Sequence, residues 1–236
     1  MSLRRALATP EGKRAYVRTL FATIADRYDL ITVLLSYGLD RGWKRRLMHL
    51  AGLTPDDRVL DLACGTGDLA QLARRQARRV VGLDLTHRML QLAAGKPGAA
   101  DLPLVRADMC ALPFPDGRFT VLTTGYGLRN VPDLDLAARE AHRVLAPGGR
   151  LLSLDFERPA NPLLRAAYLA YLTVAGSLLG LILHGDADTY RYIPASLRRY
   201  PGAAGVADIL RRSGFAEVTV VPILWGLMAI HVARRT

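Results

Sequence analysis

The sequence predicts an α/β fold in which a parallel β-sheet carries helices on both faces. Short runs rich in Val and Leu alternate with helical patterns through the middle of the chain, and this alternation is typical of such a sheet. A glycine-rich turn follows the first predicted strand, and acidic residues stand at the ends of several strands. Ligands of open α/β sheets bind beyond the carboxyl ends of the strands. The pattern that predicts the fold therefore also predicts where a site lies.

The predicted strands are short, apolar and bounded by turn residues, as buried strands are. In chain order they cover residues 58–63, 80–84, 104–106, 119–123, 150–156, 216–222 and 227–232. The predicted helices between them cover residues 69–75, 87–94, 133–145 and 204–213. No helical pattern separates the last two strands, which predicts an antiparallel edge. We expect residues 1–50 to form an N-terminal helical cap over the cleft, and residues 51–236 to form the main domain with a helical insertion at about 160–200.

Length and composition predict a globular protein with a large apolar core. The chain has 236 residues, of which 50% are hydrophobic and 22% are charged, and these values exclude a disordered chain and a coiled coil. Two cysteines, Cys64 and Cys110, are too few for a disulfide framework, and no Cys/His cluster has the spacing of a zinc site. Charges recur too often near the N-terminus for a signal peptide. We therefore expect a cytoplasmic protein without a bound metal.

The chain is strongly basic, with 32 Lys and Arg against 21 Asp and Glu and a formal net charge of +11. Such a charge admits nucleic acid or an anionic membrane surface as a partner, or it reflects only solvated arginines. The N-terminal basic residues are interspersed with apolar ones, and no RNA-binding signature is present, so we expect amphipathic helices and no nucleic acid. Residues 166–183 carry no charge and approach the roughly 20 residues that span a bilayer.

The segment at residues 61–68, Asp-Leu-Ala-Cys-Gly-Thr-Gly-Asp, connects the first predicted strand to its helix. Its glycines allow a sharp turn and let a ligand approach the backbone. Asp84, at the end of the next strand, is placed to accept hydrogen bonds from a ribose diol. The spacing matches neither the dinucleotide fingerprint nor the phosphate-binding loop. The segment therefore favours a nucleoside-containing ligand without a pyrophosphate.

The acid ahead of these glycines resembles motif I of the class I S-adenosylmethionine-dependent methyltransferases, a family with a seven-stranded Rossmann-like sheet. This resemblance implies S-adenosyl-L-methionine as the cofactor. The residues implied in binding it are Asp61, Ala63, Gly65, Thr66 and Gly67 at the methionine end, Asp84 at the ribose, Asp108 and Met109 beside the adenine, and also Leu85 and Gly125. Taken singly, Asp108 is more simply a turn cap and Met109 a core residue.

Further segments resemble the UbiE-type C-methyltransferases of ubiquinone and menaquinone biosynthesis, and they cover nearly the whole chain. They lie at residues 28–30, 35–43, 61–69, 111–116, 127–131, 143–150, 186–192, 194–196 and 200–201. The resemblance implies methyl transfer to a ring carbon of a prenylated quinol. The chain departs from the common family pattern at Gly125, at Thr120 and at residues 183–185. The departures put a hydroxyl role at position 125 in doubt and could alter the pocket wall near 183–185.

Methylation of a quinol ring carbon requires the neighbouring oxygen to lose its proton, and a free phenol has a pKa of about 10. A cation within ~4–6 Å lowers the pKa of an acid by ~1–3 units. On the resemblance, Arg129 is the leading candidate for this cation, and Asn130 for orienting a water or the substrate oxygen. An ion pair with a surface acid is the alternative for Arg129. The candidate substrate-binding residues are Tyr28, Asp29, Tyr126, Tyr190 and Tyr192, for whose tyrosines plain packing is the alternative.

A prenylated substrate needs an apolar entrance. We expect residues 163–183 to form a buried helix and loop that wall a tunnel, and the protein to make peripheral contact with the inner face of an anionic membrane. A transmembrane helix is the competing interpretation. Another phenolic or lipid acceptor is the alternative substrate, and a basic nucleic-acid-binding or non-catalytic membrane-associated protein is the alternative of another class. The sequence leaves open the quinol ring, the tail length and a homodimer.

Overall fold

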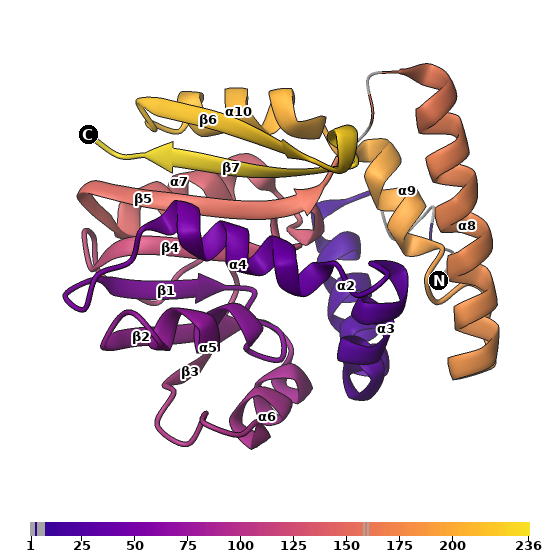
Figure 1. Cartoon of the computed structure of the whole chain (residues 1–236), viewed down its shortest axis with the longest axis horizontal. Coiled ribbons are helices and arrows are strands. Elements are labelled where there is room, and N and C mark those ends of the chain that lie inside the picture. Colours follow the sequence, from indigo (N-terminus) through magenta and orange to yellow (C-terminus); the bar gives the residue numbers. More distant parts are fainter. Residues whose placement is uncertain (1–2, 4–7, 158, 160) are drawn as a thin grey trace.

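The computed structural model describes residues 3, 8–157, 159 and 161–236. Its centre is a seven-stranded sheet in the order β3-β2-β1-β4-β5-β7-β6, with the carboxyl ends of the parallel strands on the right in Figure 1. The strands are β1 (Arg58–Leu62), β2 (Arg79–Asp84), β3 (Leu104–Arg106), β4 (Phe119–Gly125), β5 (Leu145–Phe156), β6 (Glu217–Ile223) and β7 (Met228–Arg234). The predicted seven strands and the fold class are therefore confirmed.

The sheet is parallel from β3 to β5, and β7 then runs antiparallel to both β5 and β6. This is the antiparallel edge that the sequence predicts. β5 begins five residues earlier than predicted, at Leu145, and continues through the Pro147-Gly148-Gly149 turn. Phe119 of β4 pairs with Leu145 of β5, but Val121 pairs with Arg150. The residues of the turn therefore form an irregularity within β5.

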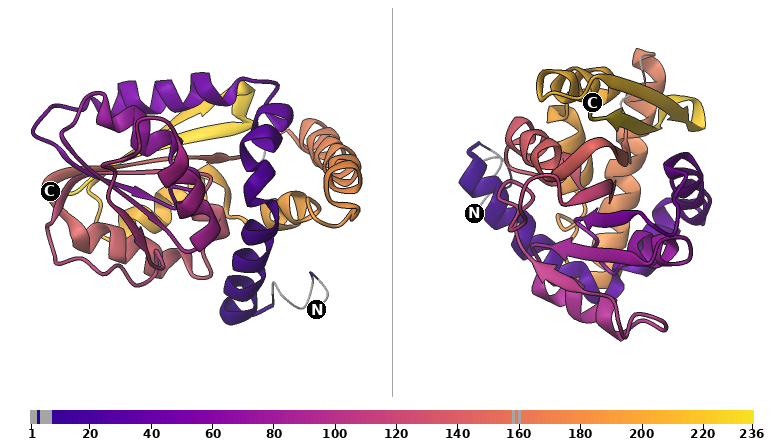
Figure 2. Two further views of the ribbon diagram at one scale, coloured as in Figure 1. Left: turned by 90° about the horizontal axis from the view of Figure 1, so that it is seen from below. Right: turned by 90° about the vertical axis from the view of Figure 1, so that its left-hand side faces the viewer.

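Helices cover both faces of the sheet. They are α4 (Asp40–Ala51), α5 (Asp68–Arg74), α6 (His87–Gly95), α7 (Leu134–Val144) and α10 (Gly202–Arg212). Figure 2 shows α4 and α5 on one face and α7 and α10 on the other. Successive β1 residues point to opposite faces: Val59 is buried against the α4 and α5 side, and Leu60 packs in the cluster on the α7 and α10 side. The sheet is thus buried on both faces, as its apolar strands predict.

The remaining helices lie beyond the carboxyl ends of the strands, where Figure 1 shows them gathered at the right. They are α2 (Pro10–Ile24), the 3-10 helix η1 (Ala25–Arg27), α3 (Tyr28–Leu35), α8 (Pro162–His184) and α9 (Tyr192–Arg199). Thr9 caps the amino end of α2, because its hydroxyl accepts a hydrogen bond from the Gly12 amide at 3.1 Å. α4, in contrast, packs Leu47 and Met48 in the sheet core. Of the described residues before position 51, α2 and α3 therefore lie over the cleft, and α4 packs on a face of the sheet.

α8 is a single helix of 23 residues, and few of them are buried. Only Leu172, Gly176 and Gly180 are buried, and their spacing places them on one helix face. A Cβ atom at Gly176 would lie 3.2 Å from the Cβ of Tyr190, so the glycine lets the following loop approach the helix. The expectation that residues 163–183 are buried is therefore wrong, whereas Tyr168, Tyr171 and Leu172 of α8 do line a cavity, as the predicted wall requires. By length and composition alone, α8 is the one described helix that suits a membrane crossing.

Candidate active site

Two adjoining pockets occupy the space between the strand ends and the capping helices. The strand-end pocket is a cavity of about 80 Å³ against the ends of β1, β2 and β4. The aromatic pocket is a larger cavity of about 300 Å³ between α2, α3, α8 and the strand ends. Phe21, Tyr28, Tyr126 and Asn130 line both. The two cavities therefore meet at these side chains, which is the arrangement that a two-substrate reaction requires.

Most of the residues predicted to bind the cofactor line the strand-end pocket. They are Ala63, Gly65, Asp84, Leu85, Asp108, Met109 and Gly125. The turn after β1 has left-handed backbone at Ala63 (φ 50°) and Gly65 (φ 54°). Asp84 fixes this turn, because its carboxylate accepts hydrogen bonds from the Gly65 amide at 2.9 Å and from the Thr86 amide at 2.7 Å. Burial raises the pKa of Asp84.

Asp61, Thr66 and Gly67 stand behind the pocket rather than in its lining. Asp61 is fully buried and accepts hydrogen bonds from the Ala70 amide at 3.0 Å and from the Thr123 hydroxyl at 2.7 Å. It thereby ties β1 to α5 and β4. Burial raises the pKa of Asp61 to about 7, although these hydrogen bonds oppose the shift. Asp61, Thr66 and Gly67 therefore shape the loop in this structure, whereas Ala63 and Gly65 line the cavity.

The predicted Asp29 also lies outside the lining of both pockets. It pairs with Lys96 at 2.7 Å and accepts a hydrogen bond from the Thr66 hydroxyl at 2.6 Å. Lys96 and the buried Lys44 both pair with Asp68, at 2.6 Å and 2.9 Å. The ion pairs thus connect α3 to the first turn of α5. Asp29 positions the loop in this structure.

Lys44 and Asp40 were not singled out from the sequence, although both belong to the buried end of this network. Burial opposes a charge on Lys44, but Asp68 and Asp40 outweigh it and raise its pKa above the ordinary value. Asp40 pairs with Lys44 at 2.6 Å and accepts a hydrogen bond from the Tyr126 hydroxyl. The i,i+4 spacing of the two residues on a helix was the available signal.

Asp108 and Met109 line the strand-end pocket at the end of β3. Asp108 accepts a hydrogen bond from the Cys110 amide at 2.8 Å, so it is a turn cap as well as a pocket residue. Its second oxygen pairs with Arg14 of α2 at 2.8 Å. Met109 is buried and, with Leu85, gives the cavity apolar walls. Asp108 is therefore both a turn cap and a pocket residue, and Met109 is both a core residue and a pocket residue.

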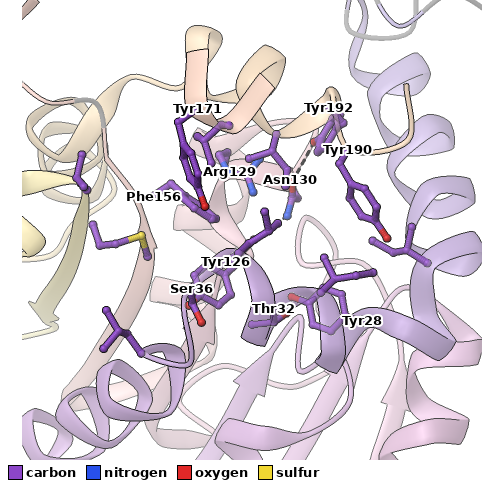
Figure 3. Close-up of a pocket in the computed structure, with 18 of the residues that line it drawn as sticks. Tyr28, Thr32, Ser36, Tyr126, Arg129, Asn130, Phe156, Tyr171, Tyr190 and Tyr192 are labelled. Atoms are coloured by element: carbon purple, nitrogen blue, oxygen red, sulfur yellow. Dashed lines mark hydrogen bonds between the residues drawn. The ribbon is translucent and has the colours of Figure 1, made fainter. Parts of the chain in front are cut away.

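The aromatic pocket is lined mainly by tyrosines and aliphatic side chains. Its aromatic residues include Phe21, Tyr28, Tyr37, Trp43, Tyr126, Phe156, Tyr168, Tyr171, Tyr190 and Tyr192. Figure 3 shows Tyr28 on the α3 side of the space and Arg129, Asn130 and Tyr192 on the opposite side. Burial raises the pKa of Tyr28, Tyr190 and Tyr192 to about 12. These phenols therefore stay neutral at ordinary pH and act as hydrogen-bonding groups.

Arg129 is 5% exposed and lines the aromatic pocket. Its Nε donates to Asp155 at 3.4 Å, its own amide donates to the other Asp155 oxygen at 3.1 Å, and its Nη1 donates to the Ser196 hydroxyl. Its guanidinium carbon lies 5.1 Å from the ring centre of Phe156. Its acidic partner is thus buried, not a surface residue. Nη2 donates no hydrogen bond to any described residue, so these N–H groups are available to a ligand.

Asn130 and Tyr126 form the junction of the pockets. In the Asn130 side chain, Nδ2 donates a hydrogen bond to the Tyr126 carbonyl at 2.6 Å, and Oδ1 accepts one from the Tyr192 hydroxyl at 3.0 Å. Tyr126 has left-handed backbone (φ 62°), which for a non-glycine residue is uncommon and typical of functional sites. Next to it, a Cβ at Gly127 would contact the Thr124 hydroxyl and lie 3.0 Å from the Ala63 Cβ. The end of β4 therefore requires glycine at position 127.

The strand-end pocket fits a methionine-linked nucleoside by its chemistry. The Asp84 oxygens each accept one backbone hydrogen bond, and a carboxylate oxygen has lone pairs for a further donor such as a ribose hydroxyl. Leu85, Met89 and Met109 supply apolar surface for a planar base. Gly65 and Gly125 keep the turn and the end of β4 free of side chains. When bound there, S-adenosylmethionine would be held by these groups.

Comparison with known proteins shows which family the chain belongs to. The chain matches the ubiE/COQ5 methyltransferase family over residues 9–235. It is 39% identical to a ubiquinone/menaquinone biosynthesis C-methyltransferase UbiE of Ectopseudomonas mendocina, with 94% of this chain and 90% of the relative covered. It is 40% identical to a demethylmenaquinone methyltransferase of Thermus thermophilus, with 92% and 100% covered.

Solved structures agree on the fold. A SAM-dependent methyltransferase of Thermotoga maritima, described as a possible histamine N-methyltransferase, superposes with a TM-score of 0.69 at 18% identity, covering 93% of this chain and 100% of that one. One from Mesorhizobium loti gives 0.60 at 22% identity, covering 81% and 96%. The family match and the motif at the end of β1 identify the cofactor as S-adenosylmethionine. The chain belongs to the ubiE/COQ5 methyltransferase family.

Proposed function

We propose that this protein transfers a methyl group from S-adenosylmethionine to a ring carbon of a prenylated quinol, as in menaquinone or ubiquinone biosynthesis. The names of its relatives from Ectopseudomonas mendocina and Thermus thermophilus support this reaction class. The observation that carries it is the meeting of the strand-end pocket with an apolar, tyrosine-lined cavity whose wall holds a buried arginine. An aromatic ring with a lipid tail matches that lining in both its polar and its apolar parts.

Arg129 is the residue that favours the reactive form of the ring in this proposal. The ring carbon attacks only when the adjacent phenol is ionised, and a guanidinium beside the oxygen lowers that pKa. Asp155 and Ser196 hold the guanidinium by Nε and Nη1, which leaves the Nη2 donors for the phenolate oxygen. When bound, the cofactor would supply the methyl from its sulfonium and leave as the neutral thioether, and the methylated ring carbon would then lose its hydrogen as a proton to water or a nearby base. Asn130, fixed by Tyr126 and Tyr192, orients the substrate oxygen or a water at the junction.

The substrate is tested by supplying radiolabelled S-adenosylmethionine with four acceptors: a short-chain demethylmenaquinol, the same compound as the quinone, a polyprenyl benzoquinol precursor, and a tail-free phenol. We expect label in the reduced acceptor and none in the quinone, which has no phenolic oxygen to ionise. The favoured ring identifies the substrate. Transfer to a tail-free phenol but to neither quinol would favour the alternative of another phenolic acceptor. Cofactor binding without transfer to any of them would refute the proposed reaction.

We also propose a cytoplasmic protein that contacts the membrane peripherally, because a prenylated quinol resides in a bilayer. The basic composition supports an anionic surface as the partner. A homodimer stays a prediction, tested by sedimentation of the purified protein in the presence and absence of cofactor.

A further inference from the structure

The exposed large hydrophobic side chains of the described chain gather on three segments that are distant in sequence. These residues are Leu30, Val33, Leu34, Tyr37 and Leu39 in and after α3, Leu163, Leu164, Val174, Leu178, Leu181 and Ile182 in α8, and Leu224 and Trp225 between β6 and β7. We call this set the apolar rim. Scattered single apolar residues are ordinary on a protein surface, but their confinement to three segments is not.

The apolar rim borders the aromatic pocket. Tyr37, Leu39 and Leu224 are exposed and also line that cavity. Tyr37 stacks on Tyr171 of α8 with ring centres 6.1 Å apart, which links α8 to the segment after α3. Figure 1 shows α3, α8 and the turn joining β6 to β7 on the same side of the molecule, beyond the carboxyl ends of the parallel strands. Outer surface and cavity lining are therefore continuous.

The three segments of the apolar rim carry no acidic side chain, although the exposed acids Asp29 and Asp186 stand next to two of them. Residues 30–39, 162–184 and 222–228 contain no Asp or Glu. Arg27 stands just before α3, and Arg41 and Arg45 follow Leu39 in α4; all three are exposed, and none pairs with an acid among the described residues. An apolar surface bordered by unpaired cations is complementary to an anionic lipid surface.

Trp225 is the most exposed member of the rim, at 93%. It lies in the turn between β6 and β7, where Leu224 and Trp225 both have left-handed backbone (φ 50° and 53°). Tryptophan favours the boundary between lipid headgroups and acyl chains. A turn that holds such a side chain in solvent, beside the mouth of an apolar cavity, is placed to reach that boundary.

We infer that the apolar rim docks on an anionic bilayer, so that the opening of the aromatic pocket faces the acyl chains. The inference rests on the proposed function, because a prenylated quinol would then enter without crossing water. α8 lies along the membrane surface instead of crossing it, since Leu172, Gly176 and Gly180 pack its inner face on the protein. Docking buries only its outer face, which includes Val174, Leu178 and Ile182.

Vesicle flotation tests the inference without any need for turnover. We expect the full chain to float with phosphatidylcholine vesicles that contain phosphatidylglycerol, and much less with phosphatidylcholine alone. Trp225→Ser and Leu178→Ser should each weaken partition about tenfold, because each removes a large apolar side chain from the contact. Binding unaffected by both substitutions would overturn the inference.

The cations are tested with a pair of matched variants. Arg41→Gln with Arg45→Gln should weaken binding to anionic vesicles by about 25-fold, since each arginine near such a surface contributes about fivefold. Arg75→Gln with Arg78→Gln removes the same charge between α5 and β2, at the amino ends of the parallel strands, and should leave binding unchanged. Equal losses in both variants would mean attraction by net charge alone and would refute a docking face.

The same variants separate the docking surface from the reaction and from a second protein copy. Trp225→Ser should retain methyl transfer to a soluble short-chain quinol and lose it with a long-chain quinol embedded in vesicles. If the full chain binds vesicles but methylates neither quinol, the proposed reaction is refuted and the docking surface is retained. A dimer that Trp225→Ser dissociates, with no binding to vesicles, would assign the rim to a second copy and overturn the inference.

Discussion

Arg129 and Asp155 are buried together at the wall of the aromatic pocket, and each depends on the other. Asp155 is fully buried, and burial raises its pKa while the Arg129 guanidinium and amide oppose that shift. The pair therefore holds the guanidinium in one orientation at the cavity wall. The sequence pointed to Arg129 through its position after a strand. It did not reveal the pairing with Asp155 or Ser196, because the sheet order brings Asp155 to Arg129 and the packing of α9 brings Ser196.

Arg129→Ala should abolish turnover and also lower the free energy of unfolding by about 3–5 kcal/mol, because it leaves the buried Asp155 without its partner. Arg129→Lys keeps a charge but lacks the Nη2 donors, so we expect a folded protein with strongly reduced kcat and unchanged affinity for S-adenosylmethionine. Ser196→Ala removes the hydrogen bond from Nη1 and the one that the hydroxyl donates to the Ile193 carbonyl, and should cost about 2 kcal/mol. Urea unfolding and steady-state kinetics measure both effects. Wild-type kcat in Arg129→Lys would contradict the role assigned to the guanidinium.

Asp61 gives the protein a defined pH dependence of stability. Its pKa is about 7 in the folded protein, against an ordinary value of 3.8, so the folded state binds the proton more tightly than the unfolded chain. The stabilising contribution of protonated Asp61 is therefore complete below pH ~4 and is lost as the pH rises toward 7. Asp61→Asn should remove this component of the slope, measured by urea unfolding between pH 4 and 8. The exposed Asp56→Asn is the control, and equal slopes in the two variants would contradict the assignment.

At the scale of elements, the close packing of α8 on the loop that follows it depends on glycine. A Cβ at Gly180 would contact the Asp186 carbonyl and lie 3.4 Å from the Ala187 Cα, so alanine displaces the segment that leads to Tyr190 and Tyr192. Gly180→Ala should raise the KM for the quinol several-fold and leave cofactor affinity unchanged. Ser177→Ala, one turn earlier on the same helix, is the control. An unchanged quinol KM in Gly180→Ala would show that this packing does not shape the pocket.

Local periodicity was enough to predict most elements, because strands of a parallel sheet are continuous apolar runs bounded by turns. The seven strands lie within a few residues of their predicted positions, apart from the early start of β5. α8 could not be predicted as well. Its residues are apolar on every side, so no periodicity marks which face is covered, and the packing of Gly176 and Gly180 against the residues that follow decides it.

The sequence predicted the site residues whose positions depend only on where the strands end. Asp84, Met109 and Gly125 line the strand-end pocket as parallel strands require. Asp29 and Thr66 lie instead in an ion-pair and hydrogen-bond network whose members Lys44, Asp68 and Lys96 come from different helices. Such a network depends on how helices pack, and sequence spacing does not reveal it.

At the scale of the whole molecule, the net charge of +11 has meaning only through its placement. Several arginines pair with acids on the surface, as Arg211 does with Asp208 and Arg191 with Asp188. The fold brings the exposed apolar segments to one side of the molecule, next to arginines without such partners. Composition alone admitted nucleic acid and membrane equally, whereas this arrangement favours a lipid surface.

The central claim is that the methyl group passes between the two pockets to carbon. The most direct test is to supply S-adenosylmethionine with a 13C-labelled methyl group and a reduced short-chain demethylmenaquinol, and to locate the label in the product by NMR. We expect a ring-bound methyl resonance with long-range coupling to the adjacent ring carbons, and its loss in Arg129→Lys. A methyl resonance typical of an aryl ether, or label that enters the quinone as readily as the quinol, would contradict the account.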